Sequence, residues 1–183
     1  KFCIAIAREN SDRAHMNCSA IGIWNKPKVD LIAKPNKRIK LPAINIGVNE
    51  EKIVIINPGI DPVKDLDKKS INKVESLLKI KTPRLITVSR FDKRKNHEKV
   101  IMALRNLKQI YPDIVYVCIG DGEELDNIKD LVKELDLSTQ VMFFNDISDD
   151  LKHSLLAKSN IFVMPSIIHK TSVEGFGIAY VEA

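Results

Sequence analysis

From about residue 84 onward, short apolar runs alternate with amphipathic stretches. The short runs are rich in β-branched and aromatic residues and are bounded by polar turns, as buried strands are; they lie at 84–90, 115–119, 141–144 and 161–164. The stretches between them repeat an apolar residue every three or four positions, as one face of a helix does; they lie at 97–110, at 123–135 and after Ser148. A further helix is predicted after Gly177. This alternation predicts an α/β fold with a Rossmann-like, doubly wound parallel sheet.

Two polar residues stand where helices are expected to begin. Asn96 precedes the stretch that starts at His97, and Ser148 precedes the one that carries Leu151 and Leu155. Asn and Ser are favoured N-caps because their side-chain oxygens accept hydrogen bonds from the first free amides. Both side chains are therefore predicted to cap their helices.

Each predicted strand is followed by a loop with polar residues or glycine. Arg90, Gly120, Asn145 and Ser166 all come just past a strand. The carboxyl ends of parallel strands lie on one edge of the sheet. We therefore expect these four loops to face one crevice, where folds of this kind bind their ligands.

The first part of the chain carries weaker signals. Residues 29–33 and 52–56 are apolar runs that predict strands. Asn57-Pro58-Gly59 places Pro and Gly where a type II turn favours them. The polar, lysine-rich stretch 62–75 predicts a linker followed by a short helix.

A glycine-rich turn between two glutamates follows the last predicted strand. Glu174 and Glu182 flank Gly175 and Gly177. The glycines permit positive φ and a close approach of the backbone to a ligand, and the amides that open the following helix suit a phosphate or a hydroxyl. This arrangement suits a polyhydroxylated, phosphate-bearing ligand. A strand-to-helix loop with an ordinary surface glutamate at each end is the competing interpretation.

Several segments resemble the retaining glycosyltransferases of family 4, which have the GT-B fold. Pro165-Ser166, Glu174-Gly175-Phe176-Gly177 and Glu182-Ala183 are similar to that family's Glu-x7-Glu signature, and Arg90 and Lys95 to its Arg-x4-Lys pair. Gly120-Asp121-Gly122 and the residues around 46–61 also resemble the family. The resemblance covers about residues 44–183, and its stronger part begins at residue 84.

The resemblance implies a role for each matching residue. Arg90 and Lys95 would hold the donor diphosphate, Glu174 would contact the donor sugar, and Glu182 would bind the ribose hydroxyls. The backbone of Gly175, Phe176, Gly177 and Ile178 would hold sugar hydroxyls and phosphate. Fixed cations stabilise the charge that grows on a departing diphosphate, which supports the roles of Arg90 and Lys95. A solvated run of charges at residues 90–95 is the alternative.

Two loops need separate comment. Gly120-Asp121-Gly122 is expected to be a structural strand-to-helix turn and not a direct ligand contact. Asn145 departs from the family, which usually has glycine after this strand, so the pocket for the nucleotide base is in doubt. Because Asn tolerates positive φ better than most residues, the turn itself is expected to survive.

The resemblance also implies a domain layout. Residues 61–183 would form the C-terminal, nucleotide-sugar-binding Rossmann-like domain, cut short within its last helix. Residues 1–60 would be a remnant of the N-terminal domain and the connection between the domains.

The implied activity is that of a retaining hexosyltransferase in glycan biosynthesis. It would move a sugar from a UDP-, GDP- or ADP-sugar to a glycan, lipid or small-molecule acceptor, with no cofactor and no essential metal. The departing diphosphate would itself take the acceptor proton. A GT-B-like nucleotide-binding module without transferase activity is the alternative. A dinucleotide-dependent oxidoreductase is disfavoured, because no Gly-x-Gly-x-x-Gly follows the first strand.

Composition excludes several other classes. The chain has 183 residues, of which 44% are hydrophobic and 29% charged, as in ordinary globular proteins. No apolar run is long enough to span a bilayer. The net charge is +5, but few aromatics interleave the basic clusters at 34–40 and 93–95. Nucleic acid is therefore not an expected partner, whereas peripheral membrane contact stays open, because many proteins of the family dock on acidic lipid.

The cysteines and histidines give no sign of a metal site. Cys3, Cys18 and Cys118 have neither metal-ligand spacing nor an even count, which fits a reducing cytoplasm, and Cys118 is expected to be buried. His97 and His153, on predicted helices, are expected to be solvated. His169, in the loop before Glu174, is a candidate for lining the site.

Overall fold

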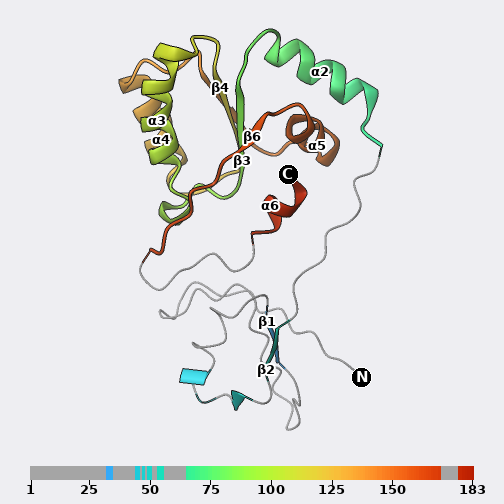
Figure 1. Cartoon of the computed structure of the whole chain (residues 1–183), viewed down its shortest axis with the longest axis vertical. Helices are drawn as coiled ribbons and strands as arrows, with labels where there is room; N and C mark the ends of the chain where they lie inside the picture. The colour runs from blue at the N-terminus through green and yellow to red at the C-terminus, as the bar shows by residue number, and fades with distance from the viewer. Residues whose placement is uncertain are drawn as a thin grey trace. The chain divides into compact units, whose positions relative to one another are not determined.

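The computed structural model describes residues 32–34, 44–45, 47, 49–50, 53–55, 65–169 and 177–183 (Figure 1). The chain divides into two compact units. The first comprises residues 1–60 and 168–178, and the second residues 61–167 and 179–183. Along the chain, the first boundary between the two units therefore lies between Ile60 and Asp61. The assignment of the first unit to an N-terminal domain stays a prediction.

The second unit is built on a parallel sheet of four strands in the order β5-β4-β3-β6. The strands are β3 (Arg84–Val88), β4 (Val115–Ile119), β5 (Val141–Phe144) and β6 (Ile161–Phe162). The predicted α/β, Rossmann-like parallel fold is confirmed. β6 is shorter than predicted, because the chain turns at Pro165, where the Ser166 amide donates to Met164 O (2.8 Å) and proline has no amide hydrogen to continue a ladder.

The helices of the second unit lie close to their predicted positions. They are α2 (Lys68–Leu78), α3 (His97–Ile110), α4 (Leu125–Glu134), α5 (Asp149–Ala157) and α6 (Ile178–Glu182, whose first residue belongs to the first unit), with a 3₁₀ turn, η2, at Lys93–Lys95. Ser148 caps α5 as predicted, since its Oγ accepts from the Leu151 amide (3.3 Å).

The predicted side-chain cap at Asn96 is wrong. Asn96 does occupy the N-cap position of α3, but it is left-handed, with φ 58° and ψ 40°. A capping side chain needs an extended backbone, and here the preceding turn η2 leads directly into α3. Among the residues that the structure describes, the Asn96 side chain bonds none of the α3 amides. Its Nδ2 donates instead to Pro165 O (3.2 Å).

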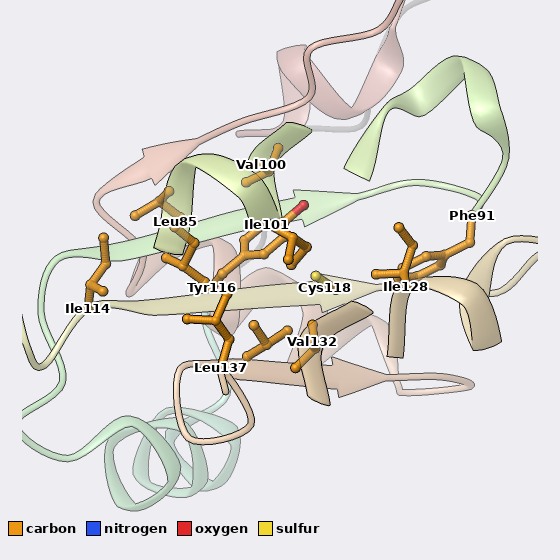
Figure 2. Packing of buried hydrophobic residues seen from close by; sticks show 12 residues of the cluster. Leu85, Phe91, Val100, Ile101, Ile114, Tyr116, Cys118, Ile128, Val132 and Leu137 are labelled. Carbon is orange, nitrogen blue, oxygen red and sulfur yellow. The ribbon is translucent and has the colours of Figure 1, made fainter. Parts of the chain in front are cut away.

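Helices cover both faces of the sheet: α3 and α4 pack on one face, and α2 and α5 on the other (Figure 1). Alternate residues of β4 point to opposite faces, as in any strand. Tyr116 and Cys118 therefore join the core under α3 and α4, which Figure 2 shows, while Val117 joins the core under α2 and α5. All five residues of β4 are buried, and the predicted burial of Cys118 is confirmed.

In the first unit, β1 (Ile32–Lys34) pairs in parallel with β2 (Ile53–Ile55). β2 lies inside the run predicted at 52–56, and β1 overlaps the run predicted at 29–33 and extends one residue beyond it. The predicted turn Asn57–Gly59 falls outside the described residues. Within the described residues, no helix combines the length and the apolar character needed to cross a membrane.

Candidate functional site

The strand order reverses between β3 and β6. The chain passes from β3 to β4 to β5 in one direction and then returns to place β6 on the other side of β3. In open parallel sheets, ligands bind at the carboxyl edge where this reversal occurs. The site is therefore bordered by Ser89–Asn96, here called the β3 loop, and by Val163–Ile167, here called the β6 segment. Arg90, Gly120, Asn145 and Ser166 all follow strands at this edge, as predicted.

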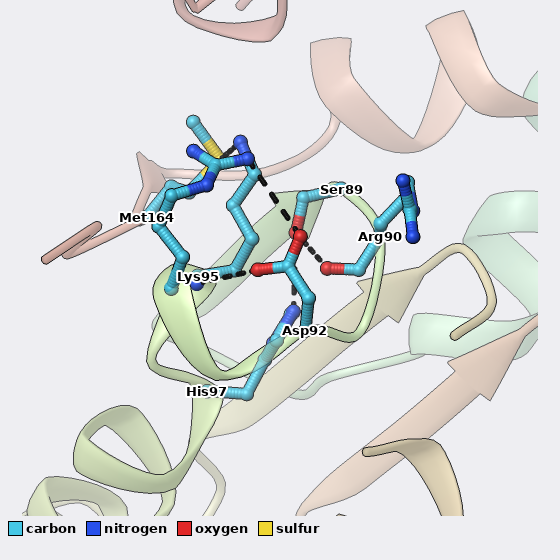
Figure 3. A network of polar contacts seen from close by, with 7 residues as sticks. Ser89, Arg90, Asp92, Lys95, His97 and Met164 are labelled. Atoms are coloured by element: carbon cyan, nitrogen blue, oxygen red, sulfur yellow. Dashed lines mark hydrogen bonds and ion pairs between the residues drawn. The ribbon is translucent and has the colours of Figure 1, made fainter. Parts of the chain in front are cut away.

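The β3 loop and the β6 segment are bonded to each other. The Ile167 amide donates to Arg94 O (2.8 Å), and Asn96 Nδ2 donates to Pro165 O (3.2 Å). Lys95 Nζ contacts Met164 Sδ at 3.4 Å (Figure 3). The two borders of the switch point are thus held together by main-chain and side-chain contacts.

The two predicted diphosphate ligands differ in exposure. Arg90 is exposed at the end of β3, whereas Lys95 is 8% exposed, and its amide donates to Asp92 Oδ1 (3.0 Å). Arg94 is half-buried, with a guanidinium nitrogen 3.7 Å from Asp92 Oδ2. The alternative of a solvated charge run at residues 90–95 is therefore wrong for Arg94 and Lys95. A buried ammonium is screened little by solvent and salt, so it acts strongly on a nearby anion.

The glycine-rich turn is described in part. Glu174, Gly175 and Phe176 lie outside the described residues. Gly177 has φ +77°, a left-handed conformation that glycine adopts without strain, and Ile178 begins α6. Both belong to the first unit.

Glu182, at the end of α6, belongs to the second unit. It is half-buried, and its Oε1 lies 3.6 Å from Lys152 Nζ on α5, which is also 3.2 Å from Asp149 Oδ1. No local pattern in the sequence predicts this ion pair. α6 also contacts β6 and the β6 segment, because the Tyr180 ring meets Phe162 edge-on at 5.1 Å and the Tyr180 hydroxyl donates to Met164 O. Met164 therefore contacts both Lys95 and α6.

His97 is a functional candidate that sequence reasoning missed, and the prediction that it is solvated is wrong. It is 3% exposed, and its ring stacks on Phe91 with 4.2 Å between centroids. Burial lowers the pKa of its imidazole to about 4, although the Arg90 carbonyl and Asp92 oppose this shift. The missed signal is periodicity: His97 precedes Val100 and Ile101 by three and four positions, on the buried face of α3. His153 and His169 are half-buried.

The turn after β4 approaches the β3 loop very closely. A Cβ on Gly120 would lie 2.0 Å from Ser89 O, and one on Gly122 would lie 2.4 Å from Phe91 O. The Phe91 amide donates to Asp121 O (2.8 Å), and the Glu124 amide donates to Phe91 O (2.9 Å). This geometry supports the expectation of a structural turn. After β5, the positive φ falls on Asp146 (50°) and not on Asn145, one residue later than expected.

Comparison with known proteins gives a family. Residues 68–183 match the family model described as "Glycosyl transferases group 1". The chain is 29% identical over 159 residues to N-acetylgalactosamine-N,N'-diacetylbacillosaminyl-diphospho-undecaprenol 4-alpha-N-acetylgalactosaminyltransferase of Campylobacter jejuni, covering 86% of this chain and 39% of the relative. It is also 29% identical over 103 residues to GDP-mannose-dependent alpha-(1-6)-phosphatidylinositol monomannoside mannosyltransferase of Mycolicibacterium smegmatis, covering 55% of this chain and 27% of the relative.

Solved structures share the fold. Anabaena HepE, in complex with UDP and glucose, matches with a TM-score of 0.65 at 23% identity, over 84% of this chain and 41% of that protein. A glycosyltransferase from Rickettsia africae matches with a TM-score of 0.60 at 22% identity, over 75% of this chain and 38% of that protein. The chain spans less than half the length of each of these proteins.

Proposed function

The chain belongs to the glycosyl transferases of group 1, and on this premise we propose that it forms the donor-binding part of a glycosyltransferase that uses a nucleoside-diphosphate sugar. One observation carries the proposal: the reversal point of the parallel sheet, within the matched residues, holds an exposed Arg90 and a buried Lys95 on one loop. Two cations at such an edge suit a diphosphate.

In this proposal Arg90 and Lys95 stabilise the departing diphosphate. As the bond from the anomeric carbon to the diphosphate breaks, its electron pair moves to the leaving oxygen. The guanidinium offers a fork of donors to two oxygens, while the ammonium acts as a point charge. Fixed charges of this kind need no reorganisation during the reaction, and this is why they lower the barrier.

Glu182 is proposed to bind the ribose hydroxyls, and Lys152 on α5 lies beside its carboxylate, with Nζ 3.6 Å from Oε1. Glu174 is proposed to contact the donor sugar, and the backbone of residues 175–178 its hydroxyls and the phosphate. We further propose retention of the anomeric configuration, as in family 4. The acceptor hydroxyl then attacks from the face the diphosphate leaves, and its proton passes to the released diphosphate oxygen.

The donor is proposed to be a UDP-, GDP- or ADP-hexose. One curated relative is named for its dependence on GDP-mannose, and the HepE structure holds UDP. Both curated relatives described above are named for lipid-bearing acceptors. This favours a lipid-linked acceptor in glycan biosynthesis, and with it an enzyme at the cytoplasmic face of a membrane in peripheral contact with it.

The test is calorimetric titration of the chain with UDP, GDP and ADP, each compared with its nucleoside. A hydrogen-bonded charge contributes about 1.5–3 kcal/mol, so Arg90→Ala should weaken binding of the preferred diphosphate about 10- to 100-fold and leave nucleoside binding unchanged. Arg105→Ala, at an exposed arginine on α3, is the matched control. Equal diphosphate affinities of the Arg90→Ala and Arg105→Ala variants would exclude the role of Arg90.

A further inference from the structure

We propose that His97 is a positioning residue for the diphosphate site: it fixes the backbone at Ser89 and Arg90, and so the direction in which Arg90 leaves the sheet. The proposal rests on the proposed function, because Arg90 is the group that is positioned. The imidazole is buried and not exposed to solvent. It stacks on Phe91, and Figure 3 shows it beside the residues of the β3 loop.

A continuous line of polar groups passes through His97. Nδ1 lies 3.1 Å from the Tyr116 hydroxyl, and Nε2 lies 3.1 Å from Ser89 Oγ. The Tyr116 hydroxyl is 2.7 Å from Thr87 Oγ1, which bonds to Val163 O. Ser89 Oγ in turn reaches Arg90 O at 3.2 Å. The line therefore begins in the β6 segment, crosses β3 and β4, and ends at the backbone of Arg90.

The far end of this line fixes the direction of its hydrogen bonds. Val163 O is a carbonyl and can only accept, so the Thr87 hydroxyl donates to it. Thr87 Oγ1 must then accept from the Tyr116 hydroxyl, which leaves the Tyr116 oxygen to accept from His97. Nδ1 consequently carries the imidazole hydrogen.

Whether Nε2 donates or accepts a hydrogen bond then depends on whether the ring gains a second proton. Burial keeps the imidazole neutral at pH 7, since it lowers the pKa of His97 to about 4. Nε2 is then an acceptor, and the Ser89 hydroxyl lies between it and Arg90 O, with one hydrogen for the two acceptors. The end of β3 is thus held by a side chain whose own orientation is set by β4 and the β6 segment.

An ordinary core residue would not need this arrangement. A phenylalanine at position 97 keeps an aromatic ring against Phe91 but loses both polar contacts. Partly satisfied polar networks are less stable than apolar packing; here one Ser89 hydrogen serves two acceptors, yet the network still connects the two borders of the site. A double-mutant cycle separates the effect of His97 on the fold from its effect on the position of Arg90.

The experiment measures the affinity of UDP, GDP and ADP, each against its nucleoside, for four proteins: the parent, His97→Phe, Arg90→Ala and the double variant. His97→Phe should weaken binding of the preferred diphosphate about tenfold and spare the nucleoside. In the Arg90→Ala background the same change should have less than about a twofold effect, because no guanidinium is left to position. His153→Phe, on the opposite face of the sheet, is the matched control and should change neither affinity.

Ser89→Ala is a second variant; it removes only a hydroxyl and does not change an aromatic ring. It should weaken diphosphate binding about threefold in the parent background and leave Arg90→Ala unaffected. Equal losses in both backgrounds, or no loss from either His97→Phe or Ser89→Ala while Arg90→Ala weakens binding, would overturn the positioning role alone. No effect of Arg90→Ala would overturn the proposed function and the positioning role together.

Discussion

The β3 loop and the turn after β4 lie side by side at the carboxyl edge of the sheet, and they are ordered by opposite means. The β3 loop is held by side chains: His97, Ser89 and Asp92 bond its polar groups. The turn after β4 is ordered by close backbone packing. Gly120 and Gly122 have no side chains, so their backbone can pack directly against the backbone of Ser89 and Phe91. Both devices act on the same short stretch, Ser89–Phe91, which carries Arg90.

This difference determines how each loop responds to change. Close backbone approach carries no titratable group, so it is insensitive to pH but intolerant of any added atom. A polar network accepts small changes in shape, but it depends on the protonation of its members. The stretch around Arg90 is thus ordered in two ways. The glycine packing does not change with pH, whereas the polar network does.

The largest expected effect comes from filling the close approach. In Gly120→Ala the new Cβ would lie 2.0 Å from a backbone oxygen at a residue with φ +140°. Because backbone must move and the conformation is strained for any L-residue, we expect the free energy of unfolding to fall by at least about 3 kcal/mol. Urea denaturation measures this. A loss below about 1 kcal/mol would show that the glycine contact does not order the turn.

The pH dependence of stability should expose the polar network. The pKa of His97 is about 4 in the folded chain and 6.5 when unperturbed. Between these values the unfolded chain binds a proton that the folded chain does not, so stability falls as pH falls through this window. From pH 7 to pH 5 this amounts to about 2 kcal/mol. His97→Phe should lose that component in urea titrations at the two pH values, and an unchanged difference would assign the pH dependence to other groups.

The smallest expected effect is that of Ser89→Ala on stability. The change removes the hydroxyl between His97 Nε2 and Arg90 O, and a hydrogen bond of this kind contributes about 1 kcal/mol. The midpoint of thermal unfolding should fall by roughly a few degrees, as measured by differential scanning calorimetry. No change in the midpoint would mean that the close approach of Gly120 alone orders the end of β3.

Hydrophobic periodicity predicted the fold well because both faces of the central strands are buried. α3 begins and ends where its apolar stripe predicts, and β4 and β5 match their apolar runs. β6 ended early because Pro165 interrupts pairing, although the apolar run continues to Met164. Local patterns thus located the elements and the edge at which the candidate site lies.

The errors concern side chains whose surroundings come from distant parts of the chain. His97 lies on the apolar face of α3, but its polarity suggested solvent, and its partners Tyr116 and Ser89 come from β4 and the end of β3. Glu182 pairs with Lys152, which is on another helix. No short-range pattern encodes such contacts. The roles of Arg90, Lys95 and Glu182 stay predictions, and Glu174 lies outside the described residues.

The position of Cys118 has a practical consequence. Its thiol is fully buried at the centre of the sheet, and burial raises the pKa of that thiol well above its usual range. Alkylating reagents attack the thiolate, so in the native state labelling of Cys118 must wait for the sheet to open. Its modification rate, read by peptide mass spectrometry, therefore reports how often the domain opens spontaneously. Cys118 is therefore a natural probe of domain opening, and no engineered cysteine is required.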